Sequence, residues 1–158
     1  MKHFLIPSFL ILTLTFAACS ATPASLPSDP APDSVSPRDS AAPFDSAMRT
    51  DGQGAIIFEV TPLNLNAPAD TLEFNIALTT HSIDLSMDLA TLATLTTDTG
   101  LTVQATLWDA PRGGHHVAGK LIFPSTVDGK PFLDGATKLT LTIVNVDAPS
   151  RVFEWGVQ

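Results

Sequence analysis

The chain has 158 residues with 16 acidic and 8 basic side chains, which leaves room for one ordinary domain and provides no basic surface for nucleic acid. Charged residues make up only 15% of it, and the formal charge is −8 at pH 7. The single Cys excludes an intrachain disulfide and any zinc or iron–sulfur site built from four thiolates.

Residues 1–18 have the pattern of a secretory signal. Met1-Lys2-His3 is a short basic start, residues 4–16 are almost purely apolar, and Ala17-Ala18 are small residues typical of a cleavage position. A helix made of this apolar stretch would rise only about 20 Å, whereas a hydrocarbon core is roughly 30 Å thick. We therefore expect an export signal and not a permanent membrane span.

The single Cys follows the small pair directly. The segment Phe16-Ala17-Ala18-Cys19 resembles the lipobox of bacterial lipoproteins, although Phe16 stands where that family usually has Leu. The resemblance implies that Cys19 is acylated, for example with palmitate, and becomes the first residue of the mature chain. The protein would then be extracytoplasmic and anchored to the bacterial cell membrane or outer membrane. The alternative is a conventional signal with a free Cys19, which is hard to maintain in an oxidising compartment.

Ser, Pro and Ala make up more than half of residues 20–54, and large apolar residues occur there only singly. Such a segment buries too little apolar surface to offset the entropy that it would lose on ordering. We therefore expect residues 19–54 to be a disordered tether and residues 55–158 to be the folded domain. A flexible coil of this length averages roughly 30 to 35 Å from end to end, which suits a domain held off a lipid surface.

Alternating apolar and polar residues, typical of β-strands, begin after Gly54 and recur to the end of the chain. The alternation predicts strands near 55–62, 72–79, 101–107, 115–123, 139–143 and 153–157. Residues 83–97 fit both a strand and a helix, but their many Thr residues favour extended structure from about 90 to 97, after a turn or short helical segment. Six or seven strands predict an all-β fold, an antiparallel immunoglobulin-like β-sandwich of about seven strands.

Three segments of this domain carry a second resemblance. Residues 80–85 have the pattern THSxDL, residues 108–119 have W...GGHHxxG, and residues 151–155 have RxFxW. All three are similar to segments of a group of uncharacterised secreted bacterial and archaeal domains. The resemblance covers roughly the whole domain. It implies a fold and a compartment, and it implies no activity.

Three histidines lie outside the leader, and side-chain parity separates them. In a strand near 115–123, His115 falls on the apolar face and His116 on the polar face. Continuing the strand at 72–79 puts His81 on the polar side too. We therefore expect His81 and His116 to meet.

A meeting of two histidines raises the possibility of a metal site. Imidazole and thioether ligands suit copper, which would then be the cofactor of this chain. The candidate ligands are His81, His116 and Met87, and Asp84 and Asp109 are nearby in the sequence. The alternative is structural. His115 then packs at the edge of the core, while His81 and His116 bond backbone carbonyls or carboxylates and hold loops in place.

The pair Gly113-Gly114 predicts a tight turn with positive φ. Trp108 has the polar parity of its predicted strand, so Trp108, Arg112 and His115 form a candidate contact surface for a protein or glycan partner. The alternative is that Arg112 stacks across Trp108 and shields it.

No sequence pattern indicates an enzyme. Ser82 beside His81 does not make a catalytic pair by adjacency, and no G-x-S-x-G elbow occurs. General acid/base chemistry by carboxylates is the form least excluded in so acidic a chain. The leading hypothesis is a surface-tethered, non-enzymatic binding domain of unknown ligand. The alternatives are an extracytoplasmic copper-binding or copper-delivery domain and a purely structural envelope lipoprotein.

Overall fold

The structure, a computed structural model, describes residues 47–157. The expected signal at 1–18, the lipidation site Cys19 and the expected tether up to residue 46 lie outside the described residues, as does Gln158. Within 47–157, no helix is both long and apolar enough to cross a membrane.

Eleven strands and one short 3₁₀ segment, η1 (Leu89–Thr91), make up the secondary structure of residues 47–157. The strands are β1 (Arg49–Asp51), β2 (Ile56–Pro62), β3 (Thr71–Thr80), β4 (Ala93–Thr97), β5 (Thr102–Gln104), β6 (Leu107–Asp109), β7 (His116–Pro124), β8 (Thr126–Val127), β9 (Lys130–Pro131), β10 (Lys138–Val144) and β11 (Ser150–Gly156). The 3₁₀ segment followed by β4 confirms the expected order of a short helical segment and then extended structure between residues 83 and 97.

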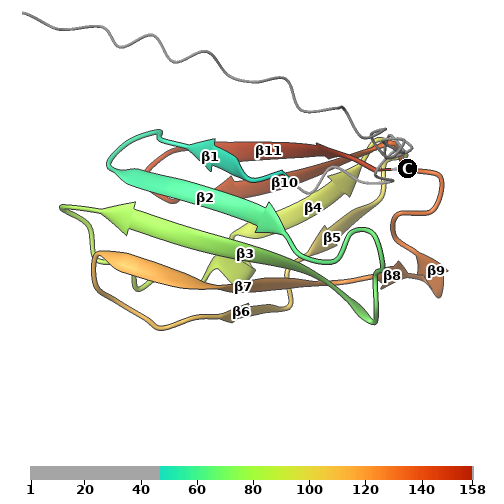
Figure 1. The fold of residues 1–158 in the computed structure, drawn as a ribbon, viewed down its shortest axis with the longest axis horizontal. Helices are drawn as coiled ribbons and strands as arrows, with labels where there is room; N and C mark the ends of the chain where they lie inside the picture. The colour runs from blue at the N-terminus through green and yellow to red at the C-terminus, as the bar shows by residue number, and fades with distance from the viewer. Residues whose placement is uncertain (1–46, 158) are drawn as a thin grey trace, which may run out of the picture. The chain divides into compact units, whose positions relative to one another are not determined.

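The strands form two packed antiparallel sheets (Figure 1). One sheet has the order β1-β2-β3-β7-β6, and the other has the order β11-β10-β4-β5, while β8 and β9 form a separate hairpin. The predicted all-β sandwich is therefore confirmed. The strand count exceeds the expected seven because β1, β8 and β9 were not predicted and one predicted strand is split in two.

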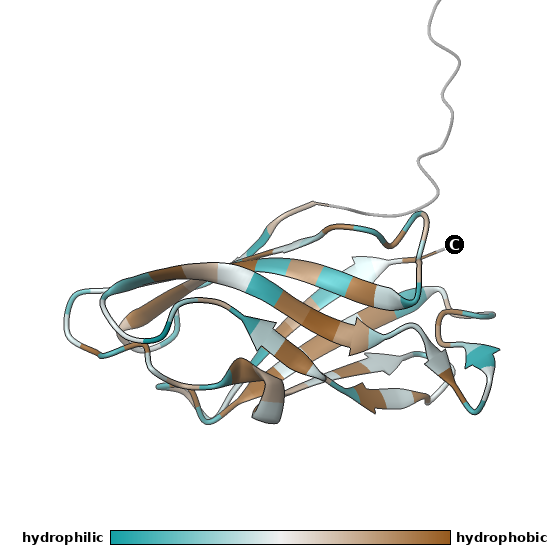
Figure 2. Cartoon of the chain, turned by 90° about the horizontal axis from the view of Figure 1, so that it is seen from below, coloured by the Kyte–Doolittle hydropathy of each residue, from teal (hydrophilic) through white to brown (hydrophobic). Residues whose placement is uncertain are grey.

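The core lies between the two sheets and follows from the alternation of the strands. In β3 every second residue from Leu72 to Leu78 is at most 1% exposed, as the sequence predicts, and Figure 2 shows apolar and polar bands alternating along the strands. The ring of Phe74 lies 5.7 Å from that of Phe123 and 5.4 Å from that of Trp155, measured between centroids. Phe74 thus contacts an aromatic ring of its own sheet and one of the facing sheet.

The single strand predicted over 101–107 is wrong, because the chain changes sheets within it. The N–H of Ala105 donates to the carbonyl of Ala93 in the second sheet, at 3.1 Å. The next N–H, that of Thr106, donates to the carbonyl of Ile122 in the first sheet, at 2.8 Å. The segment is therefore two strands, β5 and β6, in facing sheets.

This crossing reverses the parity of the residues that follow it. The inner faces of two packed sheets point toward each other, so a chain that moves from one to the other changes which side is interior. Leu107, predicted to be apolar-facing, is 50% exposed, and Trp108, predicted to be outward, is only 6% exposed. The assignment of Trp108 to an exposed contact surface is therefore wrong.

The first sheet also begins before the expected domain boundary at residue 55. Arg49 pairs with Val60 and Asp51 pairs with Phe58, so β1 adds an edge strand to β2. Residues 47–54, which we assigned to the tether, are part of the fold. Their local sequence has no alternation, and their partners lie far away in the chain, so the sequence pattern did not reveal them.

The two ends of the sandwich carry different loops. The ten residues of β3 span about 30 Å. At the end of β3, here called the histidine end, lie the loops 81–88 and 110–115. The opposite end, here called the C-terminal end, holds residues 125–137 and Val157, and it is on the right in Figure 1. The N–H of Val157 donates there to the carbonyl of Thr137, at 2.9 Å.

Candidate functional site at the histidine end

The pairing of β3 with β7 brings all three predicted histidines to one end of the sandwich. Thr79 lies opposite His116, and the N–H of Thr80 donates to the carbonyl of His115 at 3.0 Å. His81 follows Thr80 directly. The three residues are exposed, so their imidazoles are accessible from solvent.

Two loops are tied together beside these histidines. The N–H of Leu85 donates to the carbonyl of Gly114, and the N–H of Gly113 donates back to the carbonyl of Leu85, each at 3.0 Å. Gly113 and Gly114 have φ of +88° and +89°, which confirms the predicted turn and explains why glycine suits both positions. A Cβ on Gly113 would lie 3.4 Å from a carboxylate oxygen of Asp84, so the two loops also touch through that side chain.

Arg112 pairs with a carboxylate of the other loop. One terminal nitrogen, Nη2, lies 2.8 Å from Oδ2 of Asp88, and the two side chains are 60% and 36% exposed. The other oxygen of Asp88 accepts the N–H of Ala90 at 3.1 Å and caps η1. Arg112 therefore joins the loops and does not shield an outward Trp108, because Trp108 is buried, while Arg112 itself remains exposed. An ion pair this exposed contributes at most about 1 kcal/mol.

The predicted alternation holds within β7, where His116 is exposed, but it fails for His115, which precedes the strand. Val117, Leu121 and Phe123 are buried, as expected. His115 is exposed and precedes β7, so it is not the core-edge residue that the alternation predicted. Alternation predicts burial only for residues whose backbone is paired within the strand.

The candidate copper ligands are near each other in the fold without forming a finished site. Nδ1 of His116 lies 3.4 Å from Oγ1 of Thr79. Met87 is half-buried and packs against the core. Within residues 47–157, no group of three or more His, Cys, Asp or Glu side chains is arranged to hold a metal ion. A copper site here would need His81, His116 and a thioether or ligands from solvent.

Gly119, in the same strand as His116, is a position whose role the sequence analysis did not predict. A Cβ built there would lie 2.3 Å from Cβ of Ala110 and 2.4 Å from the carbonyl oxygen of Asp109. Only glycine therefore lets β7 lie so close to the chain that leaves β6. The signal was present, because an isolated Gly inside an alternating strand indicates close backbone approach.

A buried arginine on the other side of the sandwich was also missed. Arg151 is 0% exposed and forms an ion pair with Asp51. Its Nε donates to the carbonyl of Val146 at 3.2 Å, and its guanidinium lies 4.5 Å from the ring centroid of Phe58. Its Nη2 also donates to the carbonyl of Gln53. Every part of this cation is satisfied, as burial of a charge requires. Arg151 lies on the same side of β11 as two core aromatic residues, and this alternation in the sequence indicates that it is buried.

Two carboxylates owe their acidity to such contacts. Burial alone would raise the pKa of Asp51, but hydrogen bonds from the side chain and backbone of Gln53 and the charge of Arg151 together hold the pKa below its ordinary value of 3.8. Hydrogen bonds from the hydroxyl and N–H of Thr137 lower the pKa of Asp98. Both carboxylates are committed to structural contacts.

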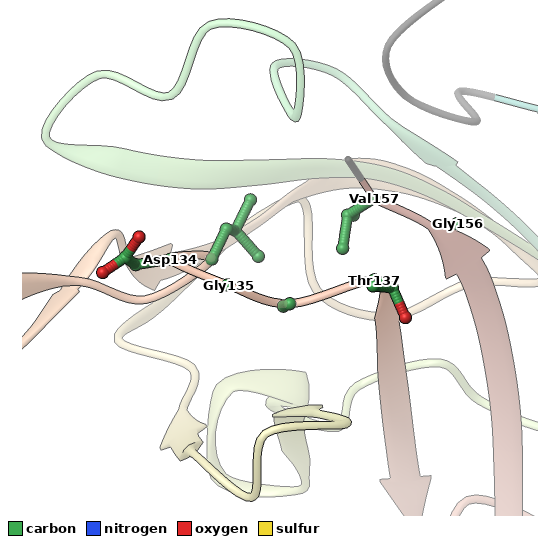
Figure 3. A pocket seen from close by; sticks show the side chains of 7 residues that line it. Asp134, Gly135, Thr137, Gly156 and Val157 are labelled. Carbon is green, nitrogen blue, oxygen red and sulfur yellow. The ribbon is translucent and has the colours of Figure 1, made fainter.

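A hollow of about 710 Å³ lies at the C-terminal end (Figure 3). Its lining is largely small or apolar, and consists of Leu133, Asp134, Gly135, Ala136, Thr137, Gly156 and Val157. None of the predicted site residues contributes to it. The histidine end and this hollow are therefore separate features.

Comparison of the chain with protein-family models, with curated proteins and with solved structures found no match. Several residues of the three segments behind the noted resemblance have structural roles in this geometry. Arg151 and Gly119 are examples, since one is a buried cation and the other permits a close backbone approach.

Proposed function

We propose that this chain is a lipid-anchored extracytoplasmic protein of the bacterial envelope whose domain binds a partner at the histidine end without catalysis. The anchor is Cys19, and the contact surface consists of Arg112 and the exposed residues His81, His115 and His116. Membership in the group of secreted domains with THSxDL and GGHHxxG segments is part of this proposal. The partner is a protein or glycan of the cell exterior.

We also propose that the sandwich is immunoglobulin-like. The order β2-β3-β7-β6 matches the A-B-E-D sheet of that fold when the strands are lettered along the chain, and β11-β10-β4-β5 matches G-F-C with one added strand. Loops at one end of such sandwiches commonly bind partners. The loops 81–88 and 110–115 correspond to two of those connections.

The observation that carries the proposal is the separation of the two ends. The carbonyl of Ala47 accepts a hydrogen bond of 2.8 Å from Nε1 of Trp155, and Arg49 lies opposite Val60, so the described chain starts toward the C-terminal end. The histidine loops lie at the other end, about 30 Å along β3. A tether that enters far from these loops supports a domain that presents them away from its anchor.

A position-specific cross-linking experiment tests the binding surface. A photo-reactive phenylalanine analogue is placed at Arg112 in whole cells, and the matched control carries it at Thr140 on the outer face of β10. We expect a discrete adduct from position 112 and none from position 140. Equal labelling at both positions, or no adduct at 112, would contradict a contact surface at the histidine end.

A fractionation experiment tests the anchor independently. Because acylation needs the thiol, Cys19→Ala should abolish lipid labelling and release the protein from the membrane fraction. A Ser20→Ala variant is the control and should remain in that fraction. Membrane retention of a full-length, processed Cys19→Ala protein would show that the lipoprotein prediction is wrong.

One observation favours copper binding as a second candidate function. The pairing of β3 with β7 places His81, His115 and His116 at the same end of the two strands, and all three are exposed. Copper accepts imidazole and thioether ligands, which suits two of these histidines with Met87. Titration with Cu(II) separates this function from partner binding.

A further inference from the structure

Residues 47–53, here called the strap, run along one side of the sandwich between an edge of each sheet. Figure 1 shows β1, the middle of the strap, beside β2 of the first sheet and β11 of the second. The backbone ladder from β1 to β2 has only three paired positions, from Arg49 opposite Val60 to Asp51 opposite Phe58. The ladder from β2 to β3 has seven. The backbone alone therefore attaches the strap only briefly.

Side-chain contacts with β11 hold the first half of the strap. Nε1 of Trp155 donates to the carbonyl of Ala47 at 2.8 Å. Nε of Arg49 donates to the carbonyl of Glu154 at 3.0 Å. The start of the strap is thus joined to the second sheet, although its backbone ladder belongs to the first.

The buried Arg151 of β11 holds the second half. Its guanidinium forms the ion pair with Asp51, and its Nη2 donates to the carbonyl of Gln53 at 2.5 Å. Nε2 of Gln53 donates in return to the carbonyl of Ser150 at 3.3 Å. Contacts with β11 are therefore spread along the strap from its first residue to its last.

The direction of the strands decides how these contacts respond to a pull. Ile56 pairs with Thr80, so β2 begins at the histidine end, and the antiparallel β1 has its first residue toward the C-terminal end. A pull on the chain before Ala47, directed away from the histidine end, acts along β1. Because β1 would slide lengthwise, all contacts of the strap are strained at the same time.

The same pull would act differently on β2 if the strap were released. It would then reach β2 at Ile56, at the histidine end, and fold the chain back along the strand. The pairs between β2 and β3 would open one after another, beginning with Ile56 and Thr80. Hydrogen bonds that open singly resist a pull less than bonds that must break together. The strap therefore converts a peeling load on β2 into a shearing load on β1.

We propose that the strap is the load-bearing element of this domain and that Arg151 fastens it to the facing sheet. This inference rests on the proposed function, in which an anchor at Cys19 and a partner at the histidine end supply opposing pulls. The ladder of three positions bears this load together with the side-chain contacts to β11. The domain then stays folded while its contact surface is pulled away from its anchor.

Single-molecule unfolding of the full chain at constant force tests the strap. In a Cys19→Ala chain, handles on Ala47→Cys and Arg112→Cys, both exposed positions, place the strap in the path of the load. As a control, handles on Thr126→Cys and Arg112→Cys load β7 between its two ends, and this path leaves out the strap. The measurement needs neither lipid nor partner, so its failure is distinct from failure of the fractionation or cross-linking experiment.

Asp51→Asn should accelerate unfolding at least about tenfold more with the handle at residue 47 than with the handle at residue 126. Gln53→Ala is a milder variant, because it leaves Arg151 paired with Asp51 and removes the bond to Ser150. It should show a difference of the same sign, roughly threefold or more. Equal acceleration with both pairs of handles would overturn the proposal, since these contacts would then stabilise the domain without bearing the load.

Discussion

Arg151 and Asp51 lie a hundred residues apart in the chain and meet as an ion pair in which the arginine is completely buried. The pair joins β11, an edge strand of one sheet, to β1, an edge strand of the other. Gln53 adds a bond from its side-chain amide to the carbonyl of Ser150, at 3.3 Å. One side of the sandwich is thus closed by side chains and not by a ladder of backbone hydrogen bonds.

The first prediction concerns this pair. Asp51→Asn removes the charge that compensates Arg151, and an uncompensated buried charge costs roughly 3 to 5 kcal/mol. Asp134→Asn, at an exposed position, should change the free energy of unfolding by at most about 0.5 kcal/mol. Urea denaturation of the two variants measures the difference. Equal effects would show that β1 is not held by this contact.

The second prediction is the pH dependence of the same contact. The pKa of Asp51 is lowered in the folded state, so its contribution to stability is complete above the ordinary value of 3.8. The contribution is lost as the pH falls through the lower, folded-state pKa. The free energy of unfolding of the wild type should therefore approach that of Asp51→Asn as the pH falls below about 4. If the difference in the free energy of unfolding between the two proteins increased as the pH fell, the assignment would be contradicted.

The third prediction tests the change of sheet between β5 and β6. Trp108 is 6% exposed and Leu107 is 50% exposed, so Trp108→Ala should cost roughly 3 to 5 kcal/mol. Leu107→Ala should cost about 0.5 kcal/mol or less. Thermal and urea unfolding of both variants decide the matter. A larger loss for Leu107→Ala would mean that the strand continues in its original parity.

The fourth prediction concerns the close approach at Gly119. An added methyl group would meet backbone and Cβ atoms of residues 109 and 110, so Gly119→Ala should lower stability by roughly 1 to 3 kcal/mol. Gly52→Ala is the matched control, because its added Cβ meets nothing within 4 Å. We expect it to be neutral or slightly stabilising. Differential scanning calorimetry of both variants provides the comparison, and an unchanged melting temperature for Gly119→Ala would contradict it.

The fifth prediction separates copper binding from a scaffold role of the histidines. If copper binds, His81→Ala and His116→Ala should each remove most of the Cu(II) affinity measured by titration of the full chain. His115 is exposed, so His115→Ala should leave both the affinity and the stability nearly unchanged. Affinity that survives both His81→Ala and His116→Ala would exclude the copper site. Loss only with His115→Ala would move the ligand set to the loop before β7.

Local patterns were sufficient for much of the fold. The alternation at 72–79 predicted the inward face of β3, because the side-chain period of a strand is two in any sheet. The Gly113-Gly114 pair predicted positive φ, because that backbone region is open chiefly to glycine. The proposed export signal and the proposed acylation of Cys19 also rest on local sequence alone, because a leader is recognised from its local sequence.

The tertiary structure alone decided the rest. Trp108 is buried because the chain passes to the facing sheet between Ala105 and Thr106, and nothing in the local alternation marks that step. β1 belongs to the fold because it pairs with β2 and because Asp51 forms an ion pair with Arg151, far along the chain. The three histidines converge because β3 and β7 pair in one register. In each case the deciding contact joins residues distant in sequence, and periodicity within a strand carries no information about what lies on the other side of the core.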